Sequence, residues 1–115
     1  VNLIDAEARG LSEGALVRVF NDRGSCLAAI KISEDIMPGV VNIPTGSWLN
    51  PATGGNISCV HGNPNVLTKD SGTSKLAQGP SAHTCLVEIE RFQGKVPKIT
   101  AFDPPKIRNL NKQKI

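Results

Sequence analysis

The chain has 115 residues, of which 39% are hydrophobic and 20% are charged, and its formal net charge is +3. This length suits one domain with a modest core, and no stretch approaches the roughly 18 apolar residues that a membrane span needs. Only four residues are aromatic, which argues against a surface that stacks nucleic-acid bases. The start has neither an initiator methionine nor a signal peptide, so we expect a piece of a longer protein.

The N-terminal third of the chain predicts a helix followed by a β-hairpin. Residues 5–10 are expected to form one short helix, which Asp5 caps and Gly10 ends. Residues 15–20 alternate between apolar and polar side chains and predict a strand. After a tight turn, residues 25–32 predict the return strand. Eleven glycines and eight prolines favour such turns over a helical bundle.

The rest of the chain predicts two further strands around a long loop. Residues 40–43 are expected to form a short strand. Residues 44–82 are rich in Gly, Pro, Asn, Ser and Thr, and a loop of this length is often functional. Residues 84–92 predict a clear strand with Val87 and Ile89 facing inward. Five or six short strands with one or two short helices indicate a small β-barrel.

The charge is divided unevenly along the chain. Residues 1–90 carry six basic and nine acidic side chains, whereas residues 91–115 carry seven basic and one acidic. We therefore expect a barrel over residues 1–92 and an extended basic tail over residues 93–115. A basic tail can bind nucleic acid or an anionic surface. The Arg and aromatic pattern of RNA-binding modules is missing, so we favour a solvated tail lying against an acidic protein surface.

Two cysteine–histidine pairs, Cys59 with His61 and His83 with Cys85, are the sharpest local feature. Residues two apart on a strand share a face, so neighbouring pairs could form a Cys₂His₂ zinc site. The spacings typical of structural zinc are missing, and one strand face rarely gives the geometry of a Cys–His nucleophile. We favour separate roles for these residues, with Cys26 as a small buried hydrophobic residue.

The long loop also contains polar groups that suit a heterocycle. The amides of Asn65 and Gln78 can donate and accept together, and Asp70 could accept two hydrogen bonds from a guanine edge. Backbone N–H groups in loops rich in small residues can approach a phosphate. The alternative is that these residues simply build turns, and the chemistry by itself leaves this alternative slightly ahead.

One run, GNPNVLTKDSGTSKLAQG at residues 62–79, carries a family resemblance. It resembles the C-terminal cofactor-binding domain of the dimethyl sulfoxide, trimethylamine N-oxide and biotin sulfoxide reductase family. Further stretches match in order and are DAEARGL at 5–11, VRVFNDRG at 17–24, PGVV at 38–41 and SAHTCLVEIE at 81–90. The resemblance covers about residues 3–105, nearly the whole chain.

The resemblance implies a mainly β fold, a double-psi β-barrel with one or two short helices. It also implies that the domain binds and buries molybdopterin guanine dinucleotide, two copies of which hold one molybdenum in these bacterial reductases of S- or N-oxides. Gly46 and Trp48 are expected to line the cofactor path. Together with Gln78, the expected cofactor-binding residues are Asn65, Thr68, Asp70, Ser74 and His83.

The resemblance further implies that the serine that ligates molybdenum lies upstream of this chain. The expected partners are therefore the remaining domains of the parent reductase, and the chain by itself is not expected to be active. We expect a periplasmic parent, with a cytoplasmic one as the alternative. The competing hypothesis is a stand-alone small β-barrel binding module whose basic tail binds nucleic acid or a protein partner.

Overall fold

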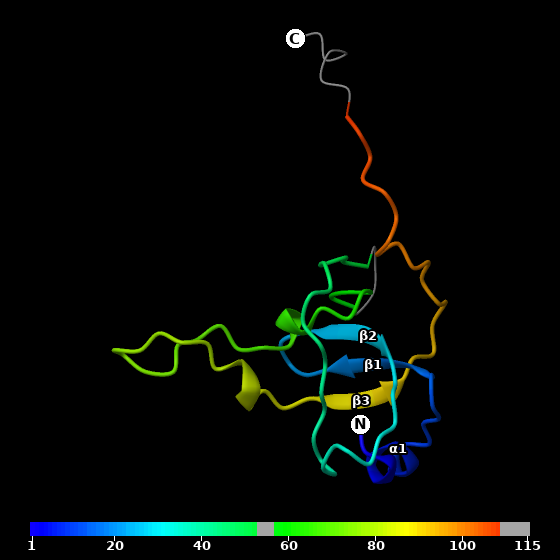
Figure 1. Cartoon of the computed structure of the whole chain (residues 1–115), viewed down its shortest axis with the longest axis horizontal. Coiled ribbons are helices and arrows are strands. Elements are labelled where there is room, and N and C mark those ends of the chain that lie inside the picture. The colour runs from blue at the N-terminus through cyan, green and yellow to red at the C-terminus, as the bar shows by residue number, and fades with distance from the viewer. Residues whose placement is uncertain (53–56, 109–115) are drawn as a thin grey trace.

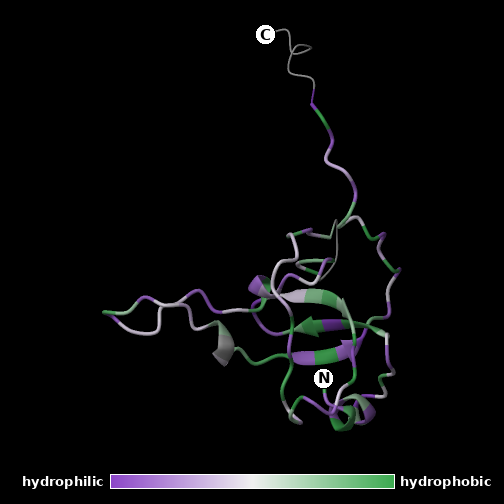
Figure 2. Ribbon diagram, viewed as in Figure 1, coloured by the Kyte–Doolittle hydropathy of each residue, from purple (hydrophilic) through white to green (hydrophobic). Residues whose placement is uncertain are grey.

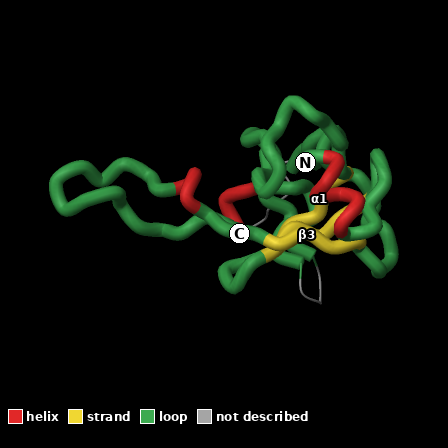
Figure 3. Tube along the Cα trace, turned by 90° about the horizontal axis from the view of Figure 1, so that it is seen from below, coloured by secondary structure: helices red, strands yellow, loops and turns green. Residues whose placement is uncertain are grey.

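The computed structural model describes residues 1–52 and 57–108 (Figure 1). Within these ranges the fold is mainly β, with one three-stranded antiparallel sheet in the order β2–β1–β3 and little helix. Loops make up most of the trace (Figure 3). The elements in chain order are helix α1 (Leu3–Ala8), strands β1 (Leu16–Phe20) and β2 (Ser25–Ala29), the 3₁₀ turns η1 (Pro64–Val66) and η2 (Ala82–Thr84), and strand β3 (Glu88–Arg91).

Strand β1 is the centre of the sheet and supplies most of its apolar face. Its β-branched residues Val17 and Val19 are each 2% exposed, and Val19 lies opposite Cys26 in β2 and Ile89 in β3. Full burial of one such side chain contributes about 1.5–3 kcal/mol. The predicted strand at residues 15–20 is confirmed, and the alternation along β1 and β3 is visible in Figure 2.

The core joins this face to the helix and to the long loop. Its buried members come from α1, all three strands and the segments between them, and they are Ala6, Leu11, Val17, Val19, Cys26, Ile30, Cys59, Leu67 and Ile89. Cys26 is fully buried, which confirms its prediction as a small core residue. Cys59 and Leu67 belong to the loop of residues 44–82, so the core fixes two points of that loop.

The opposite face of β1 carries an ion pair and a cation–π contact. The guanidinium Nη1 of Arg18 lies 2.9 Å from a carboxylate oxygen of Glu90 on β3. The same guanidinium lies over the ring of Phe20, 4.2 Å from its centroid. Arg18 and Glu90 are directly opposite each other across the strands, a position in which opposite charges stabilise a sheet.

Helix α1 begins earlier than the sequence predicts, and its capping residue is different. Oδ1 of Asn2 accepts a hydrogen bond from the backbone N–H of Ile4 at 2.9 Å. The prediction that Asp5 is the cap is wrong, because its carboxylate accepts a bond from the N–H of Gly39 at 2.7 Å. Gly10 follows the helix with a φ of 62°, a left-handed conformation typical of a glycine that ends a helix.

The hairpin between β1 and β2 is confirmed in type and position. Asn21 and Gly24 close its turn through a backbone hydrogen bond of 3.0 Å. Strand β2 is shorter than the predicted residues 25–32, since it ends at Ala29. The alternation nevertheless continues past the strand, because Ile30 is buried and Lys31 is exposed.

Two strand predictions are corrected by the structure. Residues 40–43 form no strand, although Val41 and Ile43 pack against the core. Strand β3 covers only residues 88–91 of the predicted 84–92, because the preceding residues turn through η2. Three strands are thus present in the described ranges instead of five or six. Apolar alternation in this chain reports burial, and burial does not require a hydrogen-bonded neighbouring strand.

Two segments leave the body of the fold in different directions (Figure 1). One is formed by residues 68–81 and is named the arm below. The other is the C-terminal segment, residues 93–108. The latter contacts the body at Thr100, whose Oγ1 lies 3.0 Å from Nε2 of His61. None of the helices in the described ranges has the length and apolar character of a membrane crossing.

Candidate functional site

The arm is a hairpin closed by its own backbone. The N–H of Thr73 donates to the carbonyl of Gly79 at 3.0 Å, and the N–H of Ser74 donates to the carbonyl of Ala77 at 3.0 Å. Gly72 and Pro80 form an antiparallel bridge below these bonds. All residues from 69 to 80 are exposed, and Figure 3 shows the arm standing clear of the sheet from a second direction.

Side chains of the arm stabilise its tip. Nε2 of Gln78 donates to the carbonyl of Ser74 at 2.7 Å and to that of Lys75 at 3.2 Å. Oγ of Ser74 accepts from the N–H of Ala77 at 2.8 Å. These bonds place the apolar side chain of Leu76 outermost, where it is fully exposed. Ser74 and Gln78, predicted to bind a cofactor, thus have a local role in shaping the arm, and Oε1 of Gln78 still offers an acceptor.

The arm begins beside η1, where Asn65 presents a free side-chain amide. Oδ1 of Asn63 accepts from the N–H of Asn65 at 2.9 Å and caps the turn. Oγ1 of Thr68 donates to the carbonyl of Asn65 at 3.3 Å. Asn65 takes part in these bonds through its backbone, and Thr68 through its hydroxyl. The side-chain amide of Asn65 is exposed and makes no hydrogen bond to any described residue.

Asp70 offers a second uncommitted polar group near the base of the arm. Its side chain is exposed, and no hydrogen bond or ion pair joins it to the described part of the chain. Asn65 and Asp70 therefore present an amide and a carboxylate to solvent on one short segment. His83, also predicted to bind the cofactor, lies in η2. Its side chain lies outside the described part of the structure, so its contact with the cofactor stays a prediction.

The base of the arm is held by residues that the sequence did not single out. The carbonyl of Leu67 accepts from Nδ2 of Asn21 at 2.8 Å, from Nε of Arg23 at 2.8 Å and from Sγ of Cys85 at 3.0 Å. Asn21 and Arg23 belong to the turn between β1 and β2, for which the sequence predicts no role beyond the turn itself. The signal that could have directed attention to them is their place in the stretch VRVFNDRG, which carries part of the family resemblance.

His61 and Cys85, one from each of the two cysteine–histidine pairs, have separate surroundings. Nε2 of His61 lies 3.0 Å from Oγ1 of Thr100 and 3.1 Å from Nδ2 of Asn50, whereas the thiol of Cys85 lies at the base of the arm. Among the side chains that the structure describes, which do not include that of His83, no group of three or more metal-ligating residues occurs. Nδ1 of His61 is buried, and no described atom satisfies it.

The buried thiols differ in their acidity. Burial raises the pKa of Cys26 to about 11, and the neighbouring Cys59 adds to this effect. Burial also opposes ionisation of Cys59, but backbone N–H groups, those of Asn50 and Asn63 first, bond to its sulfur and lower its pKa. Cys26 and Cys59 lie opposite each other in a parallel bridge. Both side chains are fully buried, so neither is placed to attack a substrate.

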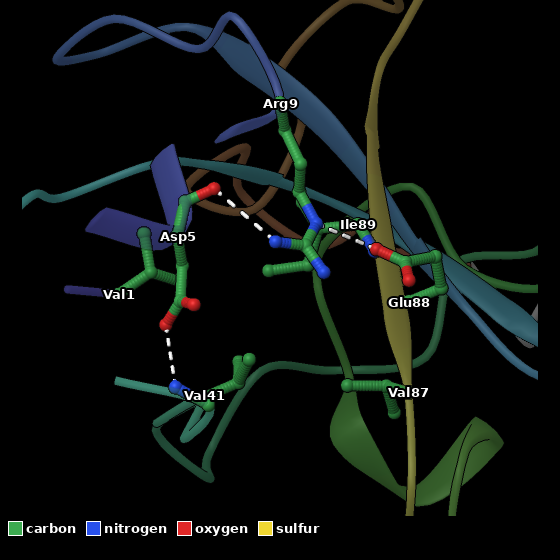
Figure 4. Close-up of a pocket in the computed structure, with 8 residues that line it drawn as sticks. Val1, Asp5, Arg9, Val41, Val87, Glu88 and Ile89 are labelled. Carbon is green, nitrogen blue, oxygen red and sulfur yellow. Dashed lines mark hydrogen bonds and ion pairs between the residues drawn. The ribbon is translucent and has the colours of Figure 1, made fainter. Parts of the chain in front are cut away.

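A small pocket of about 60 Å³ lies beside α1 and β3 (Figure 4). Nε of Arg9 lies 2.7 Å from a carboxylate oxygen of Glu88 at its wall. This ion pair lowers the pKa of Glu88, with help from the N–H of Ile89. The pocket is far too small for a dinucleotide, and none of the predicted cofactor-binding residues lines it. Trp48, expected to line a cofactor path, is 87% exposed.

Comparisons with known proteins agree with the sequence resemblance. The family model described as "Molydopterin dinucleotide binding domain" matches residues 1–86. Trimethylamine-N-oxide reductase of Salmonella typhi is 51% identical over 107 residues, which is 91% of this chain and 13% of that protein. Trimethylamine-N-oxide reductase 1 of Escherichia coli O157:H7 is 52% identical, and the enzyme of Vibrio cholerae is 50% identical, with the same coverage.

The chain thus spans about 13% of the length of these curated relatives. The matched residues include both α1 and the whole arm, so the match extends over the elements that carry the candidate site. The resemblance to the cofactor-binding domain of this reductase family is confirmed, and its cofactor class is a molybdopterin dinucleotide. The chain belongs to the molybdopterin dinucleotide-binding domain family.

Proposed function

We propose that this chain is the C-terminal domain of a bacterial molybdenum oxidoreductase, where it binds and buries molybdopterin guanine dinucleotide. The observation that carries the proposal is that Asn65 and Asp70, both exposed, present uncommitted polar groups near the base of the arm. We further propose an S- or N-oxide as substrate of the parent, and the names of the relatives favour trimethylamine N-oxide. Biotin sulfoxide and dimethyl sulfoxide are the alternative substrates of the same chemical class.

The donor set of this segment fits the proposed cofactor. A guanine or pterin edge presents N–H and NH₂ donors next to a carbonyl acceptor. The carboxylate of Asp70 can accept from two such donors, and the amide of Asn65 can donate and accept at once. Hydrogen bonds to a charged partner contribute about 1.5–3 kcal/mol each. We assign Asn65 to the pterin and Asp70 to the guanine, with Thr68, Ser74, Gln78 and His83 completing the loop contacts.

The division of labour in the parent follows from this assignment. The molybdenum, held by the dithiolenes of the cofactor, supplies oxygen-atom transfer, and the protein supplies binding and orientation. Residues of this chain hold the dinucleotide and exclude water from it. Since the chain spans 13% of its relatives, the remaining domains of the parent provide the metal ligand and the substrate path.

The fold and location of the parent complete the proposal. We assign a double-psi β-barrel to residues 1–92 and an extended basic tail to residues 93–115. The packing of Val41 and Ile43 against the core, outside any described strand, supports a barrel wall at that position. The parent is proposed to be periplasmic, which metal and pterin content of periplasmic and cytoplasmic fractions would test.

The direct test is cofactor retention in the full-length parent. Asn65→Ala removes an exposed amide that bonds to no described residue, so the fold should be unaffected. We expect molybdenum and pterin content after dialysis to fall several-fold. Lys75→Ala is the matched control, because its exposed side chain lies on the arm that follows Asn65 and forms no ion pair with the described residues. Equal cofactor content in wild type and Asn65→Ala would refute the proposed site.

A further inference from the structure

We propose that Asn21, Arg23 and Cys85 act together as positioning residues that fix the arm relative to the sheet. These three residues are named the arm clamp. The inference rests on the proposed function, since the arm carries most of the assigned cofactor-binding residues. Its central observation is that all three side chains donate to one backbone carbonyl, that of Leu67, at 2.8, 2.8 and 3.0 Å.

The clamp joins both ends of the arm. Leu67 immediately precedes the arm, and Leu86 lies beyond its end. Nδ2 of Asn21 donates to the carbonyl of Leu67 and also to that of Leu86, at 3.1 Å. A single amide thus connects the outgoing and the returning chain. Fixing both ends of a long loop removes freedom that every residue in the loop would otherwise have.

Cys85 adds a third connection at the same point. Its sulfur accepts from Nδ2 of Asn21 at 3.3 Å and from Nη2 of Arg23 at 3.4 Å, while its S–H donates to the carbonyl of Leu67. Leu67 itself is 2% exposed. Because buried carbonyl groups are costly to leave without partners, loss of these donors should shift the chain at the base of the arm.

The local structure of the hairpin turn directs the side-chain amide of Asn21 toward the base of the arm. Oδ1 of Asn21 accepts from the N–H groups of Arg23 and Gly24, at 2.9 and 3.2 Å. This fixes the plane of the amide, so its NH₂ group is directed toward Leu67, 46 residues further along the chain. The only ion pair of Arg23 among the described residues is a long one of 3.9 Å to the exposed Asp22. The guanidinium is therefore committed mainly to the base of the arm.

A single substitution can remove hydrogen bonds of the clamp while it keeps those that form the turn. Asn21→Asp retains the oxygen that accepts from Arg23 and Gly24, but it cannot donate to the two carbonyls. Asp22→Asn is the matched control at the neighbouring exposed position. Cys85→Ser retains a donor and should preserve the clamp, whereas Cys85→Ala should weaken it. This pair distinguishes hydrogen bonding from simple packing of the thiol.

The measurement is limited trypsin cleavage of the full-length parent, prepared without cofactor so that bound cofactor cannot protect the arm. Lys69 and Lys75 report on the arm, and Lys31 is the reference site outside it. We expect Asn21→Asp to speed cleavage at the arm sites roughly ten-fold, the effect of about one lost hydrogen bond. Cleavage at Lys31 should stay unchanged. Equal arm cleavage in wild type and variant, or the same acceleration at Lys31, would overturn the clamp.

Cofactor content of the loaded parent separates this inference from the proposed function. Faster arm cleavage with reduced molybdenum and pterin content supports both. Faster arm cleavage with full cofactor content supports the clamp and refutes the binding role of the arm. Reduced content with unchanged arm cleavage overturns the clamp, because Asn21 would then affect the cofactor by another route.

Discussion

Replacement of Gly24 by alanine tests the close contact between the β1–β2 turn and η1. A Cβ atom at this position would overlap the carbonyl oxygen of Val66, and it would lie 3.2 Å from the carbonyl carbon of Val66 and 3.0 Å from Oγ of Ser58. Because the atom that it would overlap, the carbonyl oxygen of Val66, belongs to the backbone, no side-chain rotation relieves the overlap. The turn and η1 must therefore separate.

The expected loss follows from two opposing effects. Overpacking against a rigid neighbour costs about 1–3 kcal/mol. Alanine also reduces the entropy of the unfolded chain, which stabilises by about 0.4–1 kcal/mol where the native φ suits it. The φ of Gly24 is not positive, so this gain applies. Gly24→Ala should lower the free energy of unfolding by about 1–2 kcal/mol.

Urea unfolding of the 115-residue chain, followed by circular dichroism, measures this change. Gly79→Ala is the matched control, since its Cβ would meet only Oγ1 of Thr73 at an ordinary 3.6 Å, and its φ is not positive either. The control should leave the free energy of unfolding within about 0.5 kcal/mol of wild type. If Gly24→Ala and Gly79→Ala had equal free energies of unfolding, the close approach of turn and η1 would be wrong.

Two further predictions concern titratable groups. The Arg9 guanidinium lowers the pKa of Glu88, so this pair stabilises the fold above the unfolded pKa of about 4.3 and the contribution is lost as pH falls through the lower folded pKa. Both side chains are more than one-third exposed, so the effect is at most a few tenths of a kcal/mol. In Glu88→Gln, the acid side of the stability–pH curve should become correspondingly flatter, and an unchanged curve would contradict the pairing. Iodoacetamide at pH 8 should label half-buried Cys85 well before Cys26, whose burial raises its pKa to about 11. Peptide mapping measures both rates, and equal labelling would show that Cys26 is not buried.

The parts of the fold that the sequence predicts correctly depend on short-range patterns. The hairpin follows from alternation before a polar turn ending in Gly24 and from an apolar run after it, and these features are all local. The prediction of Asp5 as helix cap failed because Asn2 offers the same chemistry three residues earlier. The choice between Asn2 and Asp5 depends on Ile36 and Gly39, which accept from and donate to these side chains. Such partners are distant in sequence and cannot be inferred from local pattern.

The strand predicted at residues 40–43 failed for a related reason. Val41 and Ile43 have the alternation of a half-buried strand, and they do pack against the core. A strand also needs a neighbouring backbone at the correct register, and side-chain pattern carries no information about it. Burial was therefore predictable here, and hydrogen-bonded pairing was not.

The residues of the candidate site could also be predicted only in part from the sequence. Residues of the 62–79 run could be identified from the family resemblance, and Asn65 and Asp70 do present free polar groups. The roles of Asn21 and Arg23 could not, since their partner Leu67 is more than 40 residues away. Ser74 and Gln78 show the reverse case, because their bonds lie within the arm. A turn-building role and a binding role draw on the same residue types, and only geometry separates them.

The self-contained hydrogen bonding of the arm has a consequence for evolution and engineering. Oγ of Ser81 donates to the carbonyl of Ser71 at 3.1 Å, and from Ser71 to Pro80 every described hydrogen bond is to another arm residue. Residues can therefore be inserted or deleted at the tip while the rungs below it remain paired. The length of this hairpin can therefore vary between relatives without a change in the sheet that carries it.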